Sequence, residues 1–293
     1  MKKVIIIGSK EDFHSRYILE ELHKKKIKAH YFDSRKYPIF SWSFNDENDY
    51  LILNDEKILT KDIQGIYWRW YYGVTSCRTE MIYREKTSAM ESFLYGLKSK
   101  SYNSIQAVEL HRKKGAQTML MGQSGIRIPQ TIITNDKNII EDFYNKNDKE
   151  IIYKPVRGGA YTKKLLEKDF KRLNTLINCP VQFQEYIDGV DIRIYAFESG
   201  EIFAGEINAK TVDFRQDEFA EIKKTKLPKK VQKDCLKVMK ILGLKYSGID
   251  VRKKKNGEYV FIEANPAPMF YHFEKMTQYP ITETLINNLI KEK

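Results

Sequence analysis

Oxygen-bearing side chains that could bind a metal ion occur close together at Asp250, Glu263 and Asn265. They lie in or just after two apolar runs, 249–251 and 259–264, which are separated by an Asn-Gly turn signal. Such runs predict an antiparallel hairpin that brings Asp250 beside Glu263. Because side chains alternate along a strand, Glu263 and Asn265 should point the same way. Two carboxylates and an amide oxygen suit Mg²⁺ that also binds phosphate, although acidic residues on a hairpin more often form a solvated face.

A lysine and two glycines form a second candidate element. Residues 150–153 have strand character, Lys154 follows them, and Gly158 and Gly159 lie in a flexible connection. A lysine at a strand end can reach a phosphate as a point charge, and adjacent glycines let backbone amides approach phosphate oxygens closely. A plain turn also explains the glycines, and the chain contains neither a Walker A sequence nor GxGxxG.

Residues 181–185 and 191–197 look like two strands around an Asp-Gly turn. The hydrogen-bonding edge that could meet an adenine comprises Gln184, Glu185 and Tyr186. Asp191 could accept hydrogen bonds from ribose hydroxyls, and Arg193 alternates in phase with it. The alternative for these two residues is a surface ion pair, which contributes little to stability.

The order of these elements resembles the ATP-grasp superfamily of carboxylate-amine ligases. A lysine with its glycine loop is followed by QEYIDGVDIR, then EINAKTVDFR, then GIDV and IEANPAP. Within the superfamily, the chain is most similar to ribosomal-protein glutamate ligases of the RimK type and to microviridin-type, or graspetide, peptide macrocyclases. The resemblance runs from about Lys114 to Pro268. It implies an α/β ATP-grasp fold in which an N-terminal α/β domain, a central lid domain and a C-terminal domain enclose ATP.

The resemblance also implies roles for individual residues. Lys114, ahead of the pattern Gly-Ile-x-Ile-Pro-x-Thr, matches the first nucleotide-binding lysine, and Lys154 matches the second. Gly158 and Gly159 match the mobile loop over the phosphates. The remaining matches are Glu185 and Tyr186 for adenine, Asp191 for ribose, Arg193 and Arg215 for the transferred phosphate and acyl intermediate, and Asp250, Glu263 and Asn265 for magnesium. The glycine loop VRGGAYT is shorter than in the glutamate ligases, which leaves the phosphate contacts open.

The mechanism that the resemblance implies has two steps and uses ATP and Mg²⁺. A substrate carboxylate attacks the γ-phosphate to give an acyl phosphate and ADP, and an amine or hydroxyl then displaces phosphate to form an amide or ester. This chemistry depends on positioning and charge neutralisation, and Arg215 would stabilise the tetrahedral intermediate. Since no protein nucleophile is needed, the lack of a Ser-His-Asp or Cys-His grouping does not count against catalysis.

The N-terminal third favours one subfamily. Its residues 2–8 and 28–32 predict strands and residues 15–24 a helix, as in an α/β layer. The segments DSRKYP, 33–38, and IYWRW, 66–70, loosely resemble the aspartate-to-proline and tryptophan-arginine elements of the peptide macrocyclases. The tryptophans of the second segment, Trp68 and Trp70, are equally well explained as aromatic residues on a strand face.

The leading hypothesis is therefore macrocyclisation of a ribosomally made precursor peptide, in which an Asp or Glu side chain is joined to Lys, Ser or Thr. The peptide would combine a leader with an acidic core. The second hypothesis is a ligase that adds a free amino acid, such as glutamate, to a protein or small molecule. The third is a protein that binds ATP without catalysis. The resemblance also makes a homodimer an expectation.

Composition agrees with a single compact enzyme. The sequence contains 51 basic and 39 acidic residues and has a net charge of +12. The lysines are spread widely, however, and no nucleic-acid-binding module is recognisable. An acidic substrate or nucleotide is the expected partner, without nucleic acid. Three scattered cysteines, Cys77, Cys179 and Cys235, predict neither a disulfide framework nor a zinc site. No apolar stretch approaches the ~20 residues of a membrane helix, so a cytoplasmic protein is expected.

The expected organisation has three parts: an N-terminal domain of residues 1–98, a central lid of residues 99–180 and a C-terminal domain of residues 181–293. Helices are predicted at residues 107–123, 228–242 and 281–291, and residues 128–133 lead into a strand. The polar segment 139–149 fits either a helix or a loop.

Overall fold

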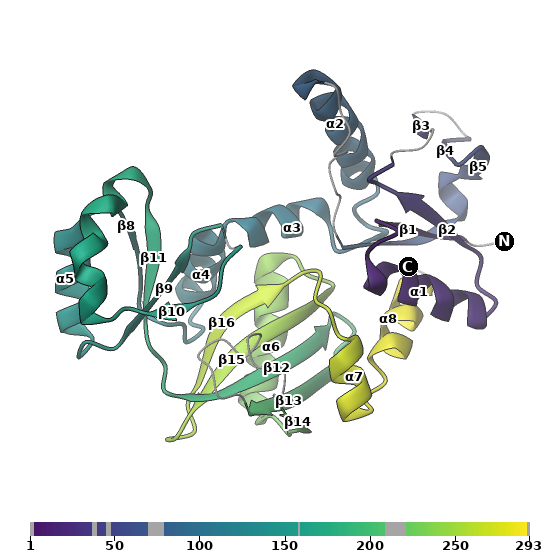
Figure 1. Cartoon of the computed structure of the whole chain (residues 1–293). Helices are drawn as coiled ribbons and strands as arrows, with labels where there is room; N and C mark the ends of the chain where they lie inside the picture. Colours follow the sequence, from purple (N-terminus) through teal and green to yellow (C-terminus); the bar gives the residue numbers. More distant parts are fainter. Residues whose placement is uncertain are drawn as a thin grey trace.

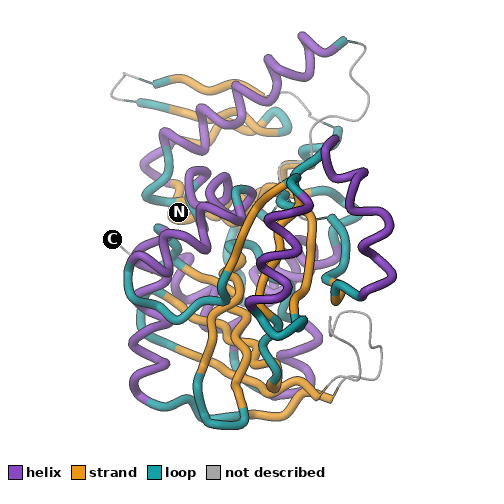
Figure 2. Tube along the Cα trace, turned by 90° about the vertical axis from the view of Figure 1, so that its left-hand side faces the viewer, coloured by secondary structure: helices purple, strands orange, loops and turns teal. Residues whose placement is uncertain are grey.

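The computed structural model describes residues 3–36, 40–44, 48–69, 79–157, 159–208 and 221–291. Its sheets and helices form three units, with an N-terminal unit on the right of Figure 1, a C-terminal sheet in the middle and a lid on the left. Both ends of the described chain lie on the N-terminal unit, as Figure 1 and Figure 2 show.

The N-terminal unit is built on a parallel sheet with the strand order β2-β1-β6-β7. Its strands are β1 (Lys3–Gly8), β2 (Ala29–Asp33), β6 (Ile63–Trp68) and β7 (Ser101–Tyr102). A small antiparallel sheet of β3 (Phe40–Ser43), β4 (Tyr50–Leu53) and β5 (Glu56–Leu59) lies beside it. The helices of this unit are α1 (Phe13–Lys24) and α2 (Glu80–Gly96). The two strands and the helix predicted for residues 2–32 are confirmed.

Strand β1 is continuously apolar from Val4 to Ile7 because both faces of its sheet are covered. Val4 and Ile6 pack with α1 and with α8 (Ile281–Ile290), whereas Ile5 and Ile7 pack with α2. The last helix of the chain therefore closes the first sheet. Its approach to β6 is so close that a side chain at Gly65 would meet the backbone oxygen of Leu289 at 2.3 Å.

The lid is an antiparallel sheet with the strand order β10-β9-β11-β8. Its strands are β8 (Thr131–Thr134), β9 (Ile151–Pro155), β10 (Lys163–Lys164) and β11 (Val181–Glu185). One face is covered by α5 (Lys137–Lys146) and the 3₁₀ segment η2 (Glu167–Asn178), so the undecided segment 139–149 is mainly helical. A boundary between residues 180 and 181 would divide this sheet, whereas one between residues 185 and 189 would not.

The C-terminal sheet is antiparallel, with the strand order β14-β13-β12-β15-β16. Its strands are β12 (Gly189–Phe197), β13 (Ile202–Asn208), β14 (Glu221–Lys224), β15 (Tyr246–Lys254) and β16 (Tyr259–Asn265). Helix α6 (Lys229–Leu242) covers one face, and α7 (Tyr271–Thr277) with the N-terminal unit covers part of the other. The remainder of that second face carries charged side chains. The lid lies beside this sheet in Figure 1.

The expectation that residues 181–185 and 191–197 flank one turn is wrong. Strand β11 pairs with β8 and β9 in the lid, whereas β12 pairs with β13 and β15 in the C-terminal sheet. The Asp-Gly signal marks the crossing between the two sheets. Gly189 is required there by packing, because a side chain would meet the backbone oxygen of Lys253 at 2.4 Å.

The single helix predicted for residues 107–123 is two helices, α3 (Ile105–Arg112) and α4 (Lys114–Gln123). The chain leaves helical geometry at Lys113, where φ is −99° and ψ is 66°. Helix α3 packs Ile105 and Val108 against the N-terminal core, whereas α4 packs Met121 against the C-terminal core. The break lets α3 pack on the N-terminal core and α4 on the C-terminal core, and Gly115, two residues after Lys113, is the weak local signal for it in the sequence.

Two smaller predictions concern cysteines and membranes. Cys179 and Cys235 are free, one exposed and one buried, and Cys77 lies outside the described residues. In the described part of the chain, no helix has the length and apolar character needed to cross a bilayer.

Candidate functional site

Strands β12, β15 and β16 bring Arg193, Asp250 and Glu263 into one row across the C-terminal sheet. Arg193 is in register with Asp250, and Asp250 is in register with Glu263. Directly opposed residues of antiparallel strands project to the same face, so the three side chains lie side by side. Asn265 lies two residues after Glu263 and points to that face as well. The predicted hairpin and the pairing of Asp250 with Glu263 are confirmed, whereas a role in binding magnesium stays a prediction.

Each carboxylate of this row is held by a cation. Arg193 Nη1 donates to Asp250 Oδ1 at 2.6 Å, and Lys114 Nζ donates to Glu263 Oε1 at 2.6 Å. The amide oxygen of Asn265 accepts a hydrogen bond from the backbone N–H of Ala267 at 2.9 Å. Lys114 thus approaches the row from the first turn of α4, although 149 positions separate it from Glu263.

The protonation state of Glu263 is set by opposing effects. Burial by itself would raise the pKa of Glu263, but the ammonium of Lys114, with His111 and Lys154 acting in the same direction, lowers it to about 2. The carboxylate is therefore ionised at neutral pH. His111 Nε2 lies 3.6 Å from Glu263 Oε1, and burial lowers the pKa of His111. Sequence reasoning missed His111, because only the packing of α3 and α4 against β16 brings it beside Glu263.

Arg193 remains a cation in this row. Burial would lower the pKa of Arg193, but the adjoining carboxylate of Asp250 raises it above its ordinary value. Space for the guanidinium exists because residue 248 is a glycine. A side chain at Gly248 would meet Arg193 Nη2 at 2.5 Å and Pro268 at 2.6 Å.

The donor set fits magnesium in chemical type. Carboxylate and amide oxygens are ligands that Mg²⁺ uses together with phosphate oxygens and water. Within residues 3–291, apart from the short segments that the structure does not describe, no group of three His, Cys, Asp or Glu side chains could hold a metal ion. A magnesium site here thus depends on two carboxylates, the amide of Asn265 and ligands from the substrate.

The lid contributes polar side chains on the face of its sheet opposite α5 and η2. Lys154, which lies within β9, is in register with Gln182, and Gln184 is in register with Ile152. Gln184 Nε2 donates to Thr131 Oγ1 at 2.9 Å, but its Oε1 has no hydrogen-bond partner among the described residues. Gln182 is fully buried, and neither of its amide atoms has a partner within that same part of the chain. Sequence reasoning missed Gln182, although alternation along β11 places it on the same face as Gln184.

The residues predicted to contact adenine and ribose lie around the crossing between the sheets. Glu185 Oε1 accepts from Arg127 Nη2 at 2.7 Å. The ring of Tyr186 has the ammonium of Lys164 at 3.7 Å from its centroid. Asp191 pairs with Arg252 at 3.3 Å, so the proposed Asp191–Arg193 ion pair is not formed and Arg193 binds Asp250.

Part of the predicted site lies outside the described residues, namely Gly158 and Arg215, as does Trp70 of the tryptophan-arginine element. Gly159 is described and has a φ of 96°, a conformation that favours glycine. Trp68 is buried, and its indole N–H donates to the backbone oxygen of Asn103 at 2.6 Å.

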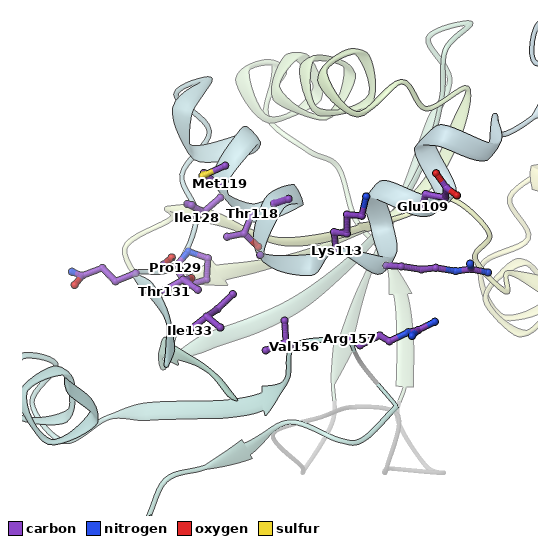
Figure 3. Close-up of a pocket in the computed structure, with 14 residues that line it drawn as sticks. Glu109, Lys113, Thr118, Met119, Ile128, Pro129, Thr131, Ile133, Val156 and Arg157 are labelled. Atoms are coloured by element: carbon purple, nitrogen blue, oxygen red, sulfur yellow. Dashed lines mark hydrogen bonds between the residues drawn. The ribbon is translucent and has the colours of Figure 1, made fainter. Parts of the chain in front are cut away.

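A cavity of about 1200 Å³ adjoins the site between the α3–α4 segment and the lid (Figure 3). Its apolar lining includes Met119, Ile133 and Val156, and its charged lining includes Lys113 and Arg157. The residues of the charged row do not line it. The cavity thus lies on the other side of the first turn of α4, next to the start of the glycine loop.

Two facing sheets, with lysines on α4 and the lid and a row of carboxylates on the C-terminal sheet, define the ATP-grasp class. The chain matches the RimK-like ATP-grasp domain over residues 111–289, which is more than half of its length, and it belongs to that family. The family and the fold predicted from the sequence are confirmed.

Named relatives in this family are ligases. The alpha-aminoadipate–LysW ligase LysX of Sulfurisphaera tokodaii is 25% identical over 183 residues, which are 58% of this chain and 64% of the relative. A probable alpha-L-glutamate ligase of Vibrio atlanticus is 24% identical over 201 residues, which are 64% of this chain and 66% of the relative. The matches thus span less than two thirds of the relatives.

Solved structures match nearly the whole chain. The ATP-grasp ligase PsnB complexed with a minimal precursor has a TM-score of 0.86 and 28% identity, covering 99% of this chain and 98% of PsnB. The macrocyclase MdnC of Microcystis aeruginosa, bound with precursor peptide MdnA, has a TM-score of 0.85 and 22% identity, covering 100% of both chains. At this lower identity, the likeness to MdnC shows the fold alone.

Proposed function

We propose that the protein is an ADP-forming ligase that macrocyclises a ribosomally made precursor peptide. The observation that carries this proposal is the extent of the likeness to PsnB, which includes the N-terminal unit. The N-terminal unit is the part in which the sequence resembles peptide macrocyclases. A likeness to PsnB that includes this unit, at 28% identity, therefore favours a peptide substrate.

The lysines of the site would bind the nucleotide phosphates. Lys154 lies on the face of the lid opposite α5 and η2, and Lys114 lies at the start of α4 beside Glu263. The residues proposed for adenine and ribose are Gln184, Glu185, Tyr186 and Asp191. We also assign Gly158 and Gly159 to the loop over the phosphates. These elements orient the phosphates, which is the main requirement of phosphoryl transfer.

Asp250, Glu263 and Asn265 would hold Mg²⁺, which neutralises phosphate charge when it is bound. Glu263 and Lys114 form an ion pair at 2.6 Å, so a cation approaching Glu263 competes with Lys114. A phosphate approaching Lys114 competes with Glu263 in the same way. When Mg²⁺ and phosphate bind together, Glu263 gains the metal ion and Lys114 gains the phosphate, so each keeps an oppositely charged neighbour. Binding of Mg²⁺ and binding of phosphate should therefore be coupled.

Arginines would neutralise the acyl phosphate and the intermediate that follows. Arg193 is a permanently charged, largely buried guanidinium in the row, and Arg215 is assigned the same task. The carboxylate oxygen of an Asp or Glu of the peptide would take the γ-phosphoryl group, and ADP would leave. A Lys, Ser or Thr of the same peptide would then form the amide or ester and release phosphate.

A second candidate function is addition of a free amino acid to a protein or small molecule. The names of the sequence relatives favour it, since these are aminoadipate and glutamate ligases. The two functions share the activation step and differ in the nucleophile and in the mass of the product.

Mass spectrometry distinguishes these functions. The protein is incubated with ATP, Mg²⁺ and the peptide encoded beside its gene, with and without free amino acids, and ADP is assayed in parallel. Loss of one water per bond from the peptide supports macrocyclisation. A gain in mass that requires a free amino acid rejects it in favour of the second function. If no ADP forms with either substrate, the protein is not the ligase proposed here.

A further inference from the structure

Gln117 joins α4 to the strand that carries Glu263 and Asn265. Its side-chain Nε2 donates to the backbone oxygen of Ala264 at 2.9 Å, and the backbone N–H of Ala264 donates to Gln117 Oε1 at 3.0 Å. One carboxamide thus satisfies both backbone groups of a single residue. That residue lies between Glu263 and Asn265, two of the three candidate magnesium ligands.

The position of β16 explains why this contact exists. The strand is the outer strand of its sheet, so some of its backbone groups have no neighbouring strand to bind. Ala264 is fully buried, and buried backbone groups without partners are costly. Gln117 is itself only 3% exposed, so its two hydrogen bonds are shielded from water.

The contact between Gln117 and Ala264 also fixes the distance between Lys114 and Glu263. Gln117 lies three residues after Lys114 in α4, and residues at that spacing share a face of a helix. Binding of Gln117 to Ala264 therefore sets the register of α4 along β16. In that register, Lys114 Nζ lies 2.6 Å from the carboxylate of the preceding strand residue, Glu263.

We propose that Gln117 is a positioning residue, which holds Lys114 beside Glu263 and fixes the backbone from Glu263 to Asn265 for a magnesium nucleotide. Gln117 itself touches neither phosphate nor metal. This inference rests on the proposed nucleotide site, but it does not depend on the identity of the substrate peptide. Loss of the two hydrogen bonds between Gln117 and Ala264 frees α4 to shift against β16. It should therefore reduce the coupling between Mg²⁺ binding and nucleotide binding.

The test is binding of ADP measured by calorimetry with and without Mg²⁺. Gln117→Leu removes both hydrogen bonds at similar size, and Gln117→Glu keeps an acceptor for the Ala264 N–H but loses the donor. Gln123→Leu, the same change at an exposed position of α4, is the matched control. We expect Mg²⁺ to strengthen ADP binding in the wild type. This gain in affinity should fall about tenfold in Gln117→Leu and by less in Gln117→Glu. Gln123→Leu should behave as the wild type.

Thermal unfolding of each variant separates positioning from stability. A purely structural role would lower the unfolding temperature while the folded fraction kept the wild-type response to Mg²⁺, and this result would overturn the inference. If Gln117→Leu does not fold, Gln117→Glu decides, and an unchanged Mg²⁺ response there rejects the role. A wild type whose ADP binding ignores Mg²⁺ would reject the inference and the proposed metal site together. Normal Mg²⁺ coupling without peptide cyclisation would reject only the proposed peptide reaction.

Discussion

The ammonium of Lys114 lies 2.6 Å from a carboxylate oxygen of Glu263, where the first turn of α4 meets β16. The contact joins the helix that follows the N-terminal unit to the strand that carries the candidate magnesium ligands. It neutralises a partly buried carboxylate, and it places the cation proposed to bind phosphate next to the anion proposed to bind Mg²⁺. The chemistry of the site should therefore be sensitive to the charge of Glu263.

Glu263→Gln keeps the size of the side chain and removes its charge. We expect ADP release with ATP, Mg²⁺ and substrate to fall about a hundredfold or more, because the metal loses a charged ligand. The control is Glu258→Gln, the same change on the same hairpin, where the carboxylate binds Lys254 and Arg127. Near-normal turnover of folded Glu263→Gln would remove the magnesium assignment.

The low pKa of Glu263 predicts how stability depends on pH. Its pKa is about 2 in the folded protein and about 4.5 in its ordinary state, so the folded protein gains stability above pH 4.5 and loses it as the pH falls toward 2. The effect is on the order of 3 kcal/mol for a shift of this size. Chemical unfolding of wild type and Glu263→Gln at several pH values should show a difference that shrinks over this window. A difference independent of pH would contradict the prediction.

Gly248→Ala should displace Arg193 from the row. The added methyl would overlap the guanidinium and Pro268, and overpacking of this kind costs about 1–3 kcal/mol. We expect lower stability in urea unfolding and slower ADP release. Gly122→Ala is the control, because its methyl meets only the mobile end of Ile128 and replaces a helical glycine. Equal activity of the two variants would show that the position of Arg193 does not matter.

Asn103 holds the segments around the site together through its side chain. Its Nδ2 donates to the backbone oxygens of Tyr246 and Pro266, both at 2.7 Å, and its Oδ1 accepts from the N–H groups of Lys245 and Tyr246. Asn103→Ala should lower the free energy of unfolding by about 2–4 kcal/mol, because buried backbone groups lose their partner. Urea unfolding measures this loss, and the exposed Asn138→Ala is the control. Equal stability of the two variants would contradict the prediction.

Lys154→Ala should weaken nucleotide binding without unfolding the lid. A charge-assisted hydrogen bond contributes about 1.5–3 kcal/mol, so ADP affinity should fall at least about tenfold. Lys163→Ala removes the same charge from an exposed position on the neighbouring strand β10. Calorimetry that found the same affinity in both variants would count against a phosphate contact by Lys154.

Neighbouring residues predict the hairpin itself, because an Asn-Gly turn signal separates two apolar runs. The pairing of Asp250 with Glu263 also requires a β-bulge, since the register of the two strands shifts between Asp250 and Val251. Alternation of side chains likewise placed Asn265 on the face of Glu263. The family resemblance, carried by the order of several motifs, identified the fold and singled out Lys114.

Only the tertiary structure decided which distant elements meet. The separation of β11 from β12 and the hydrogen bonds of Gln117 to Ala264 have no signal in neighbouring residues. A turn signal fixes a local change of direction, but it does not specify which sheet the next strand joins. Such contacts arise when each buried backbone group and apolar face finds a partner in the packed chain, and this depends on all three units at once.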